Sequence, residues 1–129
     1  MKNKFIIFYI LSIFISCQNQ SISPEKVYGK WQLKNVKTNQ VITNKEQYEK
    51  AIVQVIKSTK IEFFSDNKMS GTIWGDTTFG YWSVRNDSLI VLDNSNKKSF
   101  KTKILTLSSN KFVLEETHGK VVQQLIFVR

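Results

Sequence analysis

The residues best suited to chemistry are few, and they lack partners. His118 is the only histidine and Cys17 the only cysteine, so a His/Cys metal cluster and an intramolecular disulfide are both excluded. His118 lies in the stretch THGK, which we expect to be a turn. The aspartates in expected turns and at strand ends, where Asp is common, are Asp66, Asp76, Asp87 and Asp93. No calcium-loop spacing, phosphate loop or nucleophile elbow is present, so we predict no enzyme activity, no cofactor and no metal site.

The N-terminal segment predicts export. Lys2 and Lys4 precede an apolar run over residues 5–15, which is too short to span a bilayer, and Ser16 and Cys17 follow. A lone cysteine directly after such a run resembles the lipobox of bacterial lipoproteins, in which the cysteine is acylated, for example with palmitate, and becomes the new N-terminus. Phe14 stands where leucine is more common in a lipobox. We favour a lipoprotein signal peptide over residues 1–16, and the alternative is an ordinary signal peptide with a free thiol.

Residues 17–26 form the next segment. They are polar without periodicity, and we interpret them as a tether between the membrane and a folded domain over residues 27–129. No acidic run follows Cys17, and such a run marks surface export in some Gram-negative lipoproteins. The expected location is therefore the outer membrane, with the protein facing the periplasm and anchored through acylated Cys17.

The length and the charge of the chain limit the number of domains and the kinds of partner. A chain of 129 residues fits one domain, and 41% hydrophobic residues can form a packed core. The net charge is +9, and a run of basic residues comprises Lys97, Lys98, Lys101 and Lys103. Nucleic acid is excluded as a partner for an exported protein, and no protein partner can be named. The run could contact anionic lipid headgroups, but we favour a solvated strand face that discourages edge pairing.

One helix is expected, over residues 44–58. Thr43 and Glu46 form a capping-box pattern. An apolar stripe at helical spacing consists of Tyr48, Ala51, Ile52, Val55 and Ile56. The simplest interpretation is that this stripe packs on the rest of the domain.

The remaining segments predict strands. Val27, Gly29, Trp31 and Leu33 alternate with polar residues, which indicates a half-buried strand. After the helix, short turns separate seven more strand patterns, at residues 60–65, 69–74, 77–84, 88–93, 99–107, 111–116 and 121–129. Short connections make successive strands antiparallel neighbours. The sequence thus predicts an all-β, eight-stranded antiparallel up-and-down barrel with one helix after the first strand.

The first and last strands carry a family resemblance. Gly29-Lys30-Trp31 on the first strand, the ordered eight-strand pattern and Arg129 at the end of the last strand resemble a lipocalin. The closest resemblance is to the small lipocalin-like domains of Gram-negative envelope lipoproteins, and it covers residues 27–129. It implies that Gly29 and Trp31 help to close one end of the barrel, with Arg129 across the Trp31 ring. The helix position differs from that of larger lipocalins and suggests a plug or lid at one barrel mouth.

The resemblance also implies a ligand site. The aromatic residues that we expect to face inward and to bind a small apolar molecule or lipid are Phe63, Trp74, Trp82, Phe100 and Phe112. Because these side chains are bulky and the domain is small, we expect a small or filled cavity. Two functions stay open: a membrane-anchored module that binds a hydrophobic ligand without transforming it, and a structural or protein-interaction module, such as an inhibitor or assembly factor, with a filled barrel.

Overall fold

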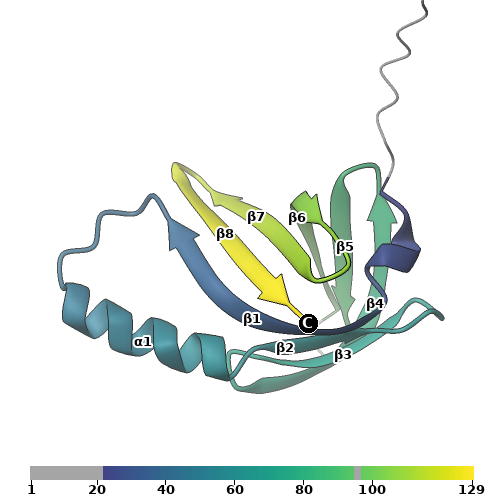
Figure 1. Cartoon of the computed structure of the whole chain (residues 1–129), viewed down its shortest axis with the longest axis horizontal. Helices are drawn as coiled ribbons and strands as arrows, with labels where there is room; N and C mark the ends of the chain where they lie inside the picture. The colour runs from purple at the N-terminus through teal and green to yellow at the C-terminus, as the bar shows by residue number, and fades with distance from the viewer. Residues whose placement is uncertain (1–21, 95–96) are drawn as a thin grey trace, which may run out of the picture.

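The structure is a computed structural model that describes residues 22–94 and 97–129 (Figure 1). The predicted signal peptide, Cys17 and residues 18–21 lie outside the described residues. A single 3₁₀ turn, η1 (Pro24–Lys26), precedes the first strand. The strands are β1 (Gly29–Thr38), β2 (Lys60–Phe63), β3 (Lys68–Ile73), β4 (Asp76–Arg85), β5 (Ser88–Asp93), β6 (Lys98–Leu107), β7 (Lys111–His118) and β8 (Val121–Val128). Among the described residues, the one α-helix, α1 (Lys45–Lys57), joins β1 to β2.

The strands close into a barrel in chain order. Each strand pairs antiparallel with the next, and β8 pairs back onto β1 through Leu33 opposite Phe127. This confirms the predicted all-β barrel with a single helix. Along each strand, residues alternate between the inner and the outer face of the barrel, as the sequence predicts. The register shifts in β1 and β6 interrupt this alternation, so the residues after each shift face the opposite way from the simple pattern.

Antiparallel order gives the barrel two different ends. The β2–β3, β4–β5 and β6–β7 turns lie at the same end as η1, the start of β1 and the end of β8. The other end collects the β3–β4, β5–β6 and β7–β8 turns and the connection from β1 to α1. The fully buried apolar side chains concentrate toward the first end, among them Val27, Trp31 and Phe112.

The helix lies outside the barrel, alongside β1 (Figure 1). Its N-cap is Asn44, whose side-chain oxygen accepts a hydrogen bond from Gln47 N at 3.1 Å, rather than the expected Thr43. None of its residues is buried, and Val55 and Ile56 pack against the core from its C-terminal half. Only the C-terminal part of the apolar stripe therefore packs against the core, whereas the sequence pattern predicts that the whole stripe does.

The segment before the barrel is fixed to the end that carries η1. Ile22, in the last part of the predicted tether, donates its backbone N–H to Asn86 O in the β4–β5 turn at 3.2 Å and packs against the core. Val27 is fully buried. The chain thus enters the barrel at this end.

Candidate functional site

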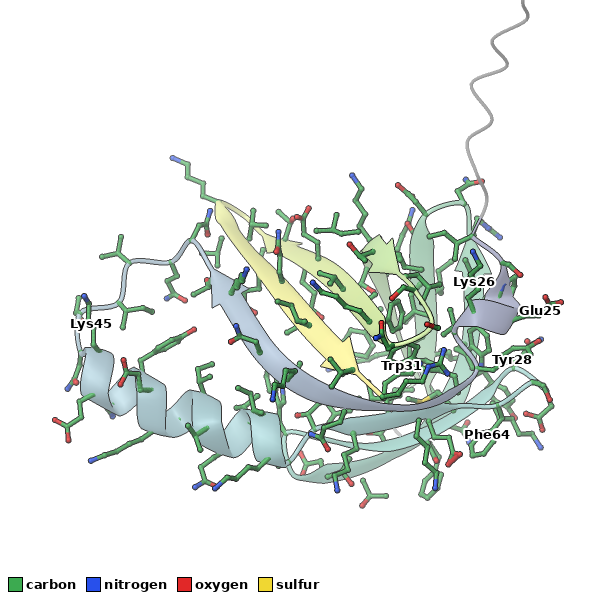
Figure 2. The ribbon with its side chains drawn as sticks, viewed as in Figure 1. Glu25, Lys26, Tyr28, Trp31, Lys45 and Phe64 are labelled. Carbon is green, nitrogen blue, oxygen red and sulfur yellow. The ribbon has the colours of Figure 1, made fainter. Side chains whose placement is uncertain are left out.

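The closed end of the barrel is built around Trp31. Its indole Nε1 donates to Val27 O at 2.8 Å, and its ring lies 5.3 Å from the Phe112 ring, measured between centroids. Figure 2 shows Trp31 on the side of the molecule where η1, which carries Glu25 and Lys26, precedes the first strand. We call Trp31, Phe112 and Trp82, whose rings are connected through the Phe63 ring, the aromatic layer, and it closes this end of the barrel.

Arg129 completes the closed end from outside. Its Cζ lies 4.0 Å from the centroid of the Trp31 ring, a cation–π contact. Its guanidinium also donates to three backbone carbonyls, those of Ser109, Tyr28 and Lys26. Gly29 has φ +111°, and a Cβ placed there would lie 2.8 Å from Arg129 Nη1. In the Gly-x-Trp triplet, Trp31 thus supplies the buried indole, and Gly29 leaves room for the Arg129 side chain because glycine has no Cβ.

Above this layer the barrel is hollow. A cavity of about 730 Å³ extends to the other end, so the expectation of a small or filled interior is wrong. The volume lies within the range of roughly 300–1,000 Å³ that is typical of small-molecule sites. Its residues are Leu33, Thr59, Ile61, Phe63, Met69, Ile73, Trp74, Asp76, Thr77, Thr78, Leu89, Val91, Asp93, Phe100, Thr102, Leu114, Glu116, His118, Leu125 and Phe127.

The cavity is apolar in its depth and polar at its mouth. Phe63, Met69 and Phe127, which adjoin the closed end, are each only 2% exposed. At the other end of the barrel, the lining includes Asp76 at the start of β4 and His118 at the end of β7. Such a gradient suits a molecule with an apolar body and a polar end.

Three of the five predicted ligand residues line this cavity. Phe63 lies in its depth, and Trp74 and Phe100 lie near the mouth. Trp82 and Phe112 face inward as expected but are not among the lining residues. Both belong to the aromatic layer of the closed end, where the Phe63 ring is 5.4 Å from that of Trp82 and 6.2 Å from that of Phe112.

Several lining residues were missed at the sequence level. His118 and Asp93, both expected in turns or at strand ends, are the last residues of β7 and β5 and face the cavity. The sequence could have predicted the position of His118, because Leu114, Glu116 and His118 are two residues apart and therefore share one face of the same strand. Thr102 was missed because it lies between lysines on a strand that appears polar.

The helix does not cover the cavity. No residue of α1 lines it, so the expectation of a helical plug or lid is wrong. The helix is instead held on the outer side of β1, where Gln32 Nε2 donates to Ile56 O at 2.8 Å and to Thr59 O at 3.0 Å. The mouth is therefore open to solvent beside Trp74, which is 60% exposed.

Two lysines of the basic run, Lys101 and Lys103, lie on the outside of the barrel. Lys101 and Lys103 alternate with the cavity-facing Phe100 and Thr102 on β6, and both lysines are exposed. Lys103 is opposite Glu115 of β7 in the sheet register. These two lysines thus lie on a solvated outer face and do not contribute to the cavity.

Within residues 22–94 and 97–129, no group of three or more His, Cys, Asp or Glu side chains is placed to hold a metal ion. Within the same ranges, no helix has the length and apolar character needed to cross a membrane.

Comparison with solved structures places the fold among lipocalin-like proteins. A lipocalin-like protein from Bacteroides uniformis matches with a TM-score of 0.55 and 17% identity, covering 81% of this chain and 98% of its own. A protein of the DUF4847 family from Bacteroides vulgatus gives 0.57 and 14%, with 81% and 94% covered. A protein of uncharacterised function from Bacteroides eggerthii gives 0.57 and 13%, with 80% and 98% covered. No family model and no curated protein matches the chain. At these identities the likeness concerns the fold: the chain is a lipocalin-like barrel.

Proposed function

We propose that the protein is a lipid-anchored envelope lipoprotein whose barrel binds a small apolar molecule. The observation that carries this proposal is the cavity of about 730 Å³ above the aromatic layer, with apolar walls and one open end. Each buried CH₂ group contributes about 0.8 kcal/mol, so a chain of roughly ten carbons would offset the cost of association. The alternative of an interaction module required a filled barrel, and the hollow interior argues against it.

The proposed anchor fits the geometry of the closed end. Cys17 precedes Ile22 by five residues, and Ile22 is bonded to Asn86 in a turn of the closed end. An acyl group on Cys17 would hold that end toward the membrane. The mouth, at the opposite end, would face the periplasm, with the anchor in the outer membrane. The function we propose is binding without transformation, since the sequence offers no catalytic motif.

Binding is tested by titrating decanol, a neutral apolar probe, into the full chain carrying Cys17→Ala. Trp74 is the only one of the three tryptophans that lines the cavity, so its fluorescence should report binding. Val91→Trp places a large side chain in the cavity wall and should abolish saturable binding. Its matched control is Leu92→Trp, one residue along β5 and 41% exposed, which should bind as the parent does. Equal binding by both variants, or no binding by the parent, would contradict the proposal.

The anchor is tested separately in cells. Cys17→Ala should move the protein from the membrane fraction to the soluble fraction, because an unmodified N-terminus lacks the acyl chains that hold it. Mass spectrometry of the parent protein should show the added acyl mass on Cys17. Unchanged fractionation together with an unmodified cysteine would rule out the lipoprotein assignment and leave the cavity proposal untouched.

A further inference from the structure

The charge of the cavity is opposite to that of the chain. The protein carries a net charge of +9, yet the charged residues that line the cavity are Asp76, Asp93 and Glu116, accompanied by His118. None of the described lining residues is lysine or arginine. A basic protein with an acidic cavity concentrates negative potential at its mouth, where it acts on an entering ligand.

The acidic residues come from three walls of the mouth. Asp76 begins β4, Asp93 ends β5, and Glu116 is two residues from the end of β7. His118 Nε2 lies 3.7 Å from Glu116 Oε2. Lys98 on β6 is opposite Asp93 in the sheet register.

Two aromatic side chains flank these carboxylates. Trp74 and Phe100 line the cavity near its mouth, and they remain 60% and 52% exposed. Exposed aromatic faces beside carboxylates attract organic cations, which gain both cation–π and charge–charge energy. An anionic headgroup would gain from neither.

Thr102 is a further polar residue of the cavity wall. The Thr102 hydroxyl is buried and has no hydrogen-bond partner within the described part of the chain. Buried hydroxyls are normally paired, so the unpaired one of Thr102 distinguishes it from the other threonines of the cavity wall. Thr59, by contrast, is fully paired, since its hydroxyl donates to Val55 O and accepts from Trp74 N.

We propose that the ligand is an amphiphile with an ammonium group. Its hydrocarbon part would lie against Phe63, Met69 and Phe127, and its ammonium group among the carboxylates and aromatic rings of the mouth. An ammonium group only donates hydrogen bonds, and the carboxylates only accept them. Fatty acids, the usual test ligands for an apolar barrel, should bind less well. This inference rests on the proposed function and specifies the chemistry of its ligand.

The test compares three probes with the same hydrocarbon chain at pH 7: decylamine and decanoate below their micelle concentrations, and decanol below its solubility limit. In the full chain carrying Cys17→Ala, decylamine should bind at least about tenfold more tightly than decanoate, with decanol between them. The double variant Asp76→Asn/Glu116→Gln should reduce that ratio to about threefold or less. The matched control is Asp66→Asn/Glu115→Gln, which removes the same charge outside the cavity and should keep the full ratio.

The outcomes separate the two proposals. If decanoate binds as tightly as decylamine, or if the double variant keeps the tenfold ratio, the inference is overturned while an apolar site remains. If none of the three probes binds, the proposed function itself fails, and this inference fails with it. Binding that persists in Val91→Trp would assign the probes to the surface and overturn both.

Discussion

At the scale of single residues, Arg129 connects the end of the last strand with the segment that enters the barrel. Its guanidinium lies over Trp31 and donates to the backbone carbonyls of Lys26, the last residue of η1, of Tyr28 just after it, and of Ser109 in the β6–β7 turn. The planar fork of arginine serves these acceptors together, which a lysine ammonium cannot do in the same geometry. Arg129 therefore holds the entry segment, the last strand and a turn at one point.

Replacing this arginine should lower stability. Arg129→Ala removes the charged hydrogen bonds and the cation–π contact, and we expect it to lower the free energy of unfolding by about 2 kcal/mol, discounted because the side chain is partly exposed. Arg129→Lys should lose at least half as much. Urea unfolding followed by far-UV circular dichroism measures both. An alanine variant as stable as the parent would show that the contact contributes nothing to closing the barrel.

The unpaired hydroxyl of Thr102 makes the opposite prediction. Thr102→Val replaces a buried polar atom by a methyl group of similar shape, so stability should be unchanged or rise by up to about 1 kcal/mol. If the hydroxyl serves a ligand, decylamine affinity should fall at the same time. Thr106→Val, on the same strand but exposed, is the matched control and should change neither quantity. A clear loss of stability in Thr102→Val would mean that the hydroxyl has a partner in solution.

At the scale of elements, α1 compensates for a short strand. β2 has only four residues and pairs with β1 from Gly29 to Gln32, so the second half of β1 lacks a strand on that side. α1 lies beside this part of the barrel and is held through Gln32, whose amide donates to Ile56 O and Thr59 O. The helix thus covers an outer flank of the sheet and leaves the mouth open.

Removing this amide should loosen the helix selectively. Gln32→Met keeps the side-chain size but deletes the donors, and we expect a loss of about 1–2 kcal/mol. Hydrogen exchange should become faster in the second half of α1 and stay unchanged in β6 and β7. Gln54→Met, at an exposed position on the helix, controls for the substitution itself. Uniform acceleration across the barrel would indicate that the helix is part of the global folding unit.

The sequence predicted the strands and the helix better than it predicted the position of their side chains along the barrel axis or the surfaces against which they pack. Alternation and turn residues located the eight strands, because both are local properties. The same alternation set the inward phase of Trp82 and Phe112 but not their level along the barrel axis, which depends on strand register. The apolar stripe of α1 likewise predicted a packed face without naming the surface it packs against. Cavity volume is a property of all eight strands together, so it could not be predicted from side-chain size.

At the scale of the whole molecule, the two ends have different roles. The closed end holds the entry segment through Ile22 and Asn86, and the open end carries the acidic mouth. With an anchor at Cys17, this arrangement would orient the cavity away from the membrane surface. Ligand exchange would then occur through the aqueous phase and not directly from the bilayer.

The central claim, that the barrel holds an apolar molecule inside, is tested most directly by methyl NMR of the leucines during a decanol titration. The leucines that line the cavity are Leu33, Leu89, Leu114 and Leu125, and those exposed outside it are Leu92 and Leu105. Saturable shifts confined to the four cavity leucines are the predicted result. Shifts of the two exposed leucines alone, or no saturable shift at all, would contradict the claim.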